Sequence, residues 1–200
     1  MNKIAILLDI GYGNFPRLTS FLVNLGYEVK IKKVTSKIEE ANLLIIPGIG
    51  NFNIIKNIQH RSNIKKYIKR YKENGNFILG ICLGMQILCD KNEESEDKSK
   101  GLGIFPFPVK KLNCNLATNR VPRIGWYNSK SMENTIFHRK LYYSHSYYVE
   151  CKNKKYIKMI TKHGNLKLPA IIQKENVIGF QFHPELSGNS GIEIFKNIIR

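Results

Sequence analysis

The sequence predicts an α/β fold in which a mostly parallel sheet lies between layers of helices. Apolar β-branched runs alternate with helical patterns in the first half, as is typical of parallel strands connected by helices. One run, Leu43–Ile46, is apolar without a break, which is expected of a strand covered on both faces. The second half instead carries successive strand-like runs, so antiparallel strands are expected beside the parallel ones.

The elements of the first half follow from their apolar patterns and boundary residues. Pro16 near the start and Gly26 just past the end mark a helix over Pro16–Leu25. A second helix, over Ile64–Lys72, is basic, and Gly75 ends it. The strands expected here are Ile4–Leu8, Glu28–Ile31, Leu43–Ile46 and Phe77–Leu79.

Short turns such as Glu175-Asn176 separate the strand-like runs of the second half. The acidic stretch Asp90–Lys100 is expected to be a solvated loop. Because no linker or internal repeat is apparent, we expect a single domain over residues 1–200. The strands expected here are Tyr142–Val149, Tyr156–Thr161, Ala170–Gln173 and Val177–Phe182, followed by a helix over Gly191–Ile199.

The chain is strongly basic, with a formal net charge of +17 over 200 residues. Such a charge fits an anionic partner, namely nucleic acid, a phosphorylated substrate or an acidic protein face. It also fits a compositional bias, since lysine, isoleucine and asparagine are plentiful throughout. The basic residues form no single stripe interleaved with aromatic residues, so nucleic-acid binding is not expected.

The four cysteines, Cys82, Cys89, Cys114 and Cys151, show neither metal-ligand spacing nor the density of a disulfide framework. The five histidines are scattered as well, so neither a metal nor a cofactor is expected. The apolar run at the start is too short to cross a bilayer, and no signal peptide is visible. These features predict a protein of the reducing cytoplasm without membrane attachment.

The segment Gly80-Ile81-Cys82-Leu83-Gly84 predicts a nucleophile. It joins the apolar run Phe77–Leu79 to a helical pattern, so Cys82 falls on a sharp strand-to-helix turn that requires small neighbours. A helix N-terminus stabilises the thiolate form of such a cysteine. A buried structural cysteine after a parallel strand is the alternative.

A second motif, Gln181-Phe182-His183-Pro184-Glu185, follows another strand-like run near the end of the chain. His183 offers an imidazole base, and Glu185 offers a carboxylate that orients it. Together with Cys82 these side chains make up the nucleophile, base and orienting acid of a catalytic triad.

These motifs resemble those of class I, triad-type glutamine amidotransferases. More narrowly, the chain resembles the glutaminase subunit of imidazole glycerol phosphate synthase, because other glutaminases of the class usually carry Gly-Gly within the loop Pro47–Phe52. The resemblance covers nearly the whole chain and implies a flavodoxin-like, three-layer fold. Further motifs in the family's order are Asp9–Asn14, Gly101–Gly103, Val121-Pro122 with Gly125-Trp126, and His145–Tyr147.

The resemblance implies that Cys82 attacks the carboxamide of glutamine, that His183 transfers the proton and that Glu185 orients the imidazole. Amides of Leu83 and of the loop around Ile49 and Gly50 are expected to bind the oxyanion, although this loop can also be read as a plain turn. The substrate-binding residues that the resemblance implies are Gln86, Glu94, His145, Ser146 and Tyr147. Two alternatives to these roles stay open: Glu94 can be a solvated surface charge, and His145 can be a structural histidine.

The resemblance also implies a partner, a cyclase subunit with a (β/α)8 barrel. Since the glutaminase fold accounts for almost the whole chain, nothing is left in it that could use the ammonia. Ammonia released into neutral water would be protonated, so it must reach that subunit by a shielded path. The cyclase would then make imidazole glycerol phosphate and aminoimidazole carboxamide ribotide in histidine biosynthesis. Trp126, Pro122 and Arg123 are expected at the interface, with a buried core position as the alternative for Trp126.

Three positions depart from the family pattern: Ile10, Arg123 and Tyr127 stand where tyrosine, histidine and asparagine are usual. Two of them lie around the expected docking motif, which leaves the partner open. One alternative is a paralogous glutaminase that supplies ammonia to a nucleotide-sugar amidotransferase in surface-polysaccharide synthesis. A second alternative, an inactive regulatory scaffold of a barrel enzyme, is disfavoured because the complete triad is present.

Overall fold

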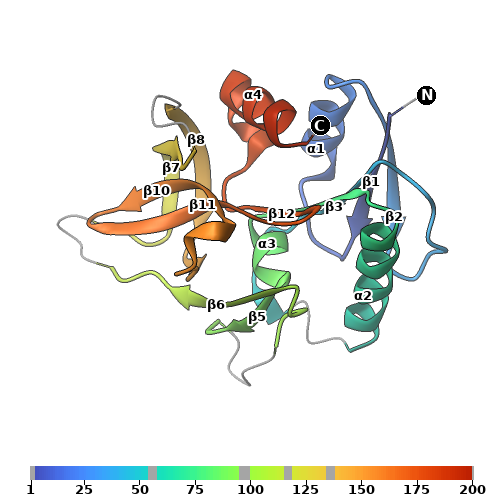
Figure 1. The fold of residues 1–200 in the computed structure, drawn as a ribbon, viewed down its shortest axis with the longest axis horizontal. Helices are drawn as coiled ribbons and strands as arrows, with labels where there is room; N and C mark the ends of the chain where they lie inside the picture. Colours follow the sequence, from blue (N-terminus) through green and yellow to red (C-terminus); the bar gives the residue numbers. More distant parts are fainter. Residues whose placement is uncertain (1–2, 54–57, 95–99, 115–118, 134–137, 200) are drawn as a thin grey trace.

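The computed structural model describes residues 3–53, 58–94, 100–114, 119–133 and 138–199. Within these residues a nine-stranded sheet forms the middle layer, with helices on both of its faces (Figure 1). A three-stranded sheet lies on the side of the molecule that carries α3. The expected α/β class, with parallel strands first and antiparallel strands in the C-terminal half, is confirmed.

The parallel half of the large sheet has the order β2-β1-β3-β4-β12. Each neighbouring pair in it is parallel. Every residue of Leu43–Ile46 is buried, because both faces of this central strand are covered. The strands are β1 (Lys3–Asp9), β2 (Tyr27–Lys33), β3 (Leu43–Ile46), β4 (Phe77–Ile81) and β12 (Val177–Phe180).

The antiparallel half continues from β12 in the order β11-β10-β7-β8. Strand β7 was not expected from the sequence, since its residues are largely polar and include a glycine. It lies between β10 and β8 and carries the Gly-Trp motif. The strands are β7 (Arg123–Ser131), β8 (His138–His145), β10 (Ile157–His163) and β11 (Leu166–Lys174).

The expectation of one strand over Tyr142–Val149 was wrong. Strand β8 ends at His145, and the chain then passes into the small sheet as β9 (Tyr147–Val149). The short interruption at Ser146 therefore places a non-strand segment between two sheets. That segment is where the chain reaches the functional site described below.

The acidic stretch was also expected to begin as a loop, but its first residues lie in β5 (Cys89–Asn92). This strand pairs in parallel with β6 (Phe105–Lys111), which in turn pairs with β9. Strand β6 was missed because Pro106 and Pro108 interrupt its pattern, and proline argues against a strand.

Helices α1 (Phe15–Val23) and α4 (Gly188–Ile198) cover one face of the parallel half, whereas α2 (Ile58–Glu73) and the short α3 (Leu83–Ile87) cover the other (Figure 1). The expected helices are thus confirmed, with α2 longer than its apolar pattern indicated. Two one-turn helices in the described residues are η2 (Lys154–Tyr156) and η3 (Pro184–Leu186).

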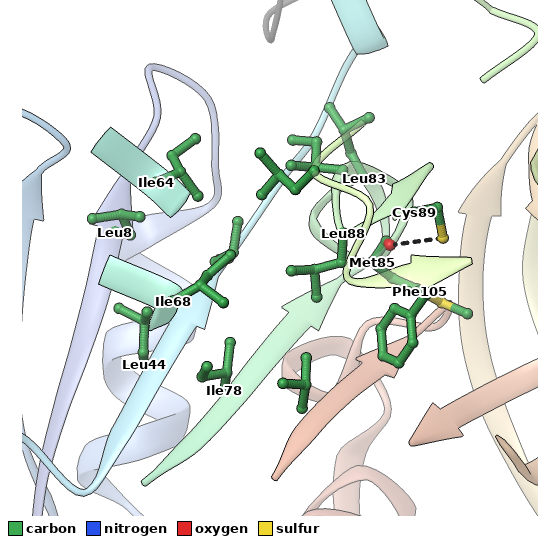
Figure 2. Packing of buried hydrophobic residues seen from close by; sticks show 14 of the residues in the cluster. Leu8, Leu44, Ile64, Ile68, Ile78, Leu83, Met85, Leu88, Cys89 and Phe105 are labelled. Carbon is green, nitrogen blue, oxygen red and sulfur yellow. Dashed lines mark hydrogen bonds between the residues drawn. The ribbon is translucent and has the colours of Figure 1, made fainter. Parts of the chain in front are cut away.

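The core on the α2 face is made of aliphatic side chains from helix and sheet. Figure 2 shows Ile64 and Ile68 of α2 against Leu8, Leu44 and Ile78 of the strands. Burying side chains of this size stabilises the fold by about 1.5–3 kcal/mol each. This packing fixes the carboxyl ends of β3, β4 and β12, which is where the site lies.

Candidate active site

Cys82 occupies a strained turn between β4 and α3. It is the N-cap of α3, and its φ of 52° lies in the left-handed region that side chains other than glycine rarely adopt. The turn packs so closely against its neighbours that it requires glycine on either side of Cys82: a Cβ on Gly84 would lie 1.8 Å from the Ile46 carbonyl oxygen. One on Gly80 would lie 2.7 Å from the backbone of Gly84.

The sheet register brings His183 to the same turn. Strands β4 and β12 are parallel neighbours in which Ile81 pairs with Phe180, so the residues that follow both strands emerge at one edge. The Cys82 amide donates to the Phe180 carbonyl at 2.7 Å, and the His183 amide donates to the Tyr142 carbonyl at 2.9 Å. The Cys82 thiol and the His183 imidazole line one pocket at this edge, and the neighbouring sulfur favours the charged form of the imidazole.

Glu185 completes this row of side chains. The His183 Nδ1 atom lies 2.9 Å from Glu185 Oε1, and both side chains are buried. Burial opposes the charged imidazole, but the neighbouring Cys82 sulfur and the Glu185 carboxylate outweigh it and raise the pKa of His183 to about 10. The arrangement therefore favours a protonated imidazole between two groups that carry or develop negative charge.

A pocket of about 220 Å³ opens above Cys82. All the residues expected to bind substrate or oxyanion line it, together with Pro122. Ile124 and Ser144, which were not expected, line it as well. Its lining residues are Ile49, Gly50, Cys82, Leu83, Gln86, Glu94, Pro122, Ile124, Ser144, His145, Ser146, Tyr147 and His183.

Two of the expected substrate contacts are held in place by hydrogen bonds. The Gln86 amide nitrogen donates to the Tyr147 carbonyl at 3.1 Å, from one helical turn beyond the nucleophile. Glu94 Oε2 accepts the Phe52 amide at 2.9 Å, and burial raises the pKa of this carboxyl. Glu94 is therefore a fixed, partly buried acid at the pocket rather than a freely solvated charge.

The loop after β3 packs directly on the nucleophile turn. A Cβ on Gly48 would lie 2.7 Å from Leu83 Cβ and 2.8 Å from the Gly84 amide nitrogen. Gly50 has a φ of +109°, which an L side chain rarely adopts, and Ile49 is about half exposed at the pocket. The glycines at 48 and 50 thus let backbone amides approach the space above Cys82.

His145 lines the pocket and is otherwise buried. Its Nδ1 lies 2.8 Å from the Tyr147 carbonyl and its Nε2 lies 3.4 Å from Arg123 Nη1. Burial, followed by the Arg123 charge, lowers the pKa of His145 to about 3, so the ring is neutral. Of the two readings left open, a satisfied neutral histidine fits this geometry.

The residues expected at a docking surface divide into two groups. Trp126 is 52% exposed and Pro122 is exposed, so a core position for the tryptophan is ruled out. The expectation for Arg123 was wrong, because its side chain is fully buried. The alternation of β7 explains this: Ile124 and Trp126 point outward, and Arg123 points inward. That alternation is the signal that would have found Ile124.

The described residues contain no group of histidine, cysteine, aspartate or glutamate side chains arranged to hold a metal ion. In the same residues no helix is long and apolar enough to span a bilayer.

The comparisons with known proteins agree with this geometry. The profile of the family described as glutamine amidotransferase class-I matches residues 6–200. The imidazole glycerol phosphate synthase subunit HisH of Caldanaerobacter subterraneus subsp. tengcongensis is 36% identical over 197 residues, which cover 96% of this chain and 95% of that protein. The subunit of the same name from Lactococcus lactis subsp. lactis is 36% identical over 202 residues, covering 98% and 97%.

A solved structure, described as PurLQS from Thermotoga maritima, has the same fold. Its TM-score is 0.74 at 18% identity, and the match covers 100% of this chain and 98% of that one. The likeness supports the three-layer architecture and its mixed sheet.

Proposed function

The chain belongs to the class-I glutamine amidotransferases, and on this premise we propose that it is the glutaminase subunit of an imidazole glycerol phosphate synthase. It hydrolyses glutamine to glutamate and ammonia, and the ammonia goes to a partner subunit. The observation that carries the proposal is that Cys82 and His183 line one pocket and that Glu185 contacts the His183 ring at 2.9 Å. The relatives named above carry the assignment to this synthase.

In the proposed reaction, the Cys82 sulfur attacks the carboxamide carbon of glutamine. His183, which the site favours in its protonated form, holds the proton given up by the thiol and passes it to the departing nitrogen, so ammonia leaves and a thioester forms on Cys82. Water then attacks the thioester with His183 as base, which releases glutamate and restores the thiol. Glu185 holds the imidazole and stabilises its cation throughout.

Each tetrahedral intermediate carries an oxyanion that needs donors already in position. We assign these donors to the Leu83 amide and to the loop of Ile49 and Gly50, whose close packing on the nucleophile turn supports the assignment. Glu94 is assigned to the ammonium group of glutamine. Gln86, Ser146 and Tyr147 complete the wall on which the rest of the amino acid rests.

The partner is proposed to be a cyclase with a (β/α)8 barrel that docks over the pocket mouth. The outward side chains of Trp126 and Ile124, 52% and 54% exposed, support a contact there. A shielded path is needed because ammonia released into neutral water becomes protonated and loses its nucleophilicity. The four free cysteines support a reducing cytoplasm as the location.

Genetic complementation tests the function. In a histidine auxotroph that lacks its own glutaminase subunit, this chain should restore growth without histidine. The Cys82→Ala variant should fail at low ammonium and succeed with excess ammonium, because a cyclase can use ammonia from solution. No rescue by the unchanged chain, combined with rescue of a surface-polysaccharide defect, would contradict the proposal and favour the nucleotide-sugar pathway.

A further inference from the structure

Arg123 is a buried cation at the start of β7, outside the set of residues that line the pocket. Its guanidinium lies between two aromatic rings, 3.7 Å from the centroid of Tyr127 and 4.1 Å from that of Tyr143. Its Nη2 donates to Thr161 Oγ1 at 2.7 Å and to the Lys162 carbonyl at 3.2 Å. Both rings and both acceptors fix the plane of the guanidinium, so the directions of its Nη1 donors are fixed as well.

The Nη1 group of Arg123 lies against His145. Arginine only donates hydrogen bonds, so the His145 Nε2 at 3.4 Å from Nη1 is the acceptor and carries no proton. A carbonyl oxygen only accepts, so the Nδ1 at 2.8 Å from the Tyr147 oxygen carries the proton and donates it. Two independent neighbours therefore select the same neutral tautomer.

The contacts that run from Arg123 through His145 reach the pocket at the Tyr147 carbonyl. It accepts from His145 Nδ1 and also from the Gln86 side chain at 3.1 Å. On the other side of His145, the Ser144 carbonyl faces the Cys82 sulfur at 3.7 Å. Strand β8 ends at His145 and β9 begins at Tyr147, so Ser146 lies between the two strands, where its carbonyl accepts the Leu112 amide at 2.8 Å.

We propose that Arg123 is a positioning residue for glutamine: by holding His145 as the Nδ1–H tautomer, it anchors the Ser144–Tyr147 wall on which the substrate lies. This rests on the function proposed above. It also accounts for two departures from the family pattern, because Arg123 and Tyr127 pack against each other.

Three cationic or titratable groups around His145 disfavour its cation: Arg123 on β7, His163 on β10 and His183 before η3. The hydrogen bond to the Tyr147 carbonyl acts in the opposite direction, and the ring of Tyr143 also faces His145, with 5.7 Å between the ring centroids. After burial, the Arg123 charge lowers the pKa of His145 most, so loss of this charge moves that pKa upward. A protonated His145 would lose the acceptor that Arg123 uses.

The first test needs no variant and no turnover. Nitrogen-15 NMR of histidine-labelled protein reports the tautomer of each ring, and His145 should be neutral and protonated at Nδ1 between about pH 5 and pH 8. An Nε2–H tautomer, or a cation in that range, overturns the proposal. Because this readout is independent of hydrolysis, it stands or falls separately from the glutaminase assignment.

The second test compares Arg123→Met and Arg123→Lys in the glutaminase assay of the complex. Arg123→Met should raise the KM for glutamine about tenfold, as expected for loss of a hydrogen bond to a charged group, with a smaller change in kcat. Its KM should also increase toward acidic pH, because the pKa of His145 has risen. Arg123→Lys, which keeps one donor and the charge, should restore part of the affinity.

Ser129→Ala is the matched control. It removes a buried hydrogen bond from the same strand, the 2.6 Å contact between Ser129 and the Tyr143 hydroxyl, without touching His145. It should lower stability while the KM and its pH dependence stay as in the unchanged protein. Equal shifts of KM in all three variants would show a purely structural role for Arg123 and overturn the proposal.

Discussion

Ile81 pairs with Phe180 across the parallel strands β4 and β12, and this register brings Cys82 and His183 together. Neither strand specifies a reaction, but each ends at the same edge of the sheet. The turn after β4 then orients the thiol, and the segment after β12 orients the imidazole. The chemistry thus depends on a pairing between strands that are far apart in the sequence.

The pKa of His183 supplies the first prediction. Glu185→Gln removes a carboxylate that favours the imidazolium, so the pKa of His183 should fall from about 10 toward its ordinary 6.5. An NMR titration measures this, and kcat should fall by about 10²-fold or more if His183 is the catalytic base. An unchanged titration would show that Glu185 does not govern the imidazole.

The same shift has a consequence for stability. A group whose pKa is raised by folding stabilises the folded state fully below its ordinary pKa, here 6.5, and loses this effect as the pH rises through about 10. The unchanged protein should therefore exceed Glu185→Gln in stability at neutral pH by more than it does above pH 10. Urea unfolding at both pH values measures the difference.

A second prediction concerns the nucleophile turn. Gly84→Ala places a Cβ 1.8 Å from the Ile46 carbonyl oxygen, and because backbone cannot move aside, stability should fall by about 3 kcal/mol or more. Gly26→Ala is the comparison: it has a φ of +85° but open space, so only backbone strain of about 1–2 kcal/mol is expected. Equal losses in thermal unfolding would contradict the steric argument.

Much of the fold and of the candidate site could be predicted from the sequence, because the patterns that indicate them are local. The continuous apolar run of β3 and the glycines around Cys82 each require a specific local structure. The strands β5, β6 and β7 could not be predicted, since their polar residues, prolines and glycine are tolerated only in the tertiary context. Arg123 was misplaced for a related reason: a buried arginine depends on aromatic rings contributed by two strands.

A third prediction concerns the partner surface. Trp126 is exposed and lies edge-on to Tyr142, with 6.0 Å between ring centroids, so truncation should leave the fold intact. If the partner docks here, Trp126→Ala should weaken binding to the cyclase by about 2 kcal/mol or more, as for a central aromatic anchor. Leu166→Ala, at an exposed leucine that does not line the pocket, is the control. Equal affinities for the two variants in a titration would place the interface elsewhere.

The central claim is that Cys82 forms the covalent bond to substrate, and a glutamine analogue with an electrophilic diazoketone tests it directly. Peptide mass spectrometry of the treated protein should find the adduct on Cys82 alone, because Cys82 lines the pocket, whereas Cys89, Cys114 and Cys151 do not. Hydrolysis of glutamine should stop in proportion to the adduct. An adduct on another residue, or full activity in a protein labelled at Cys82, would contradict the account.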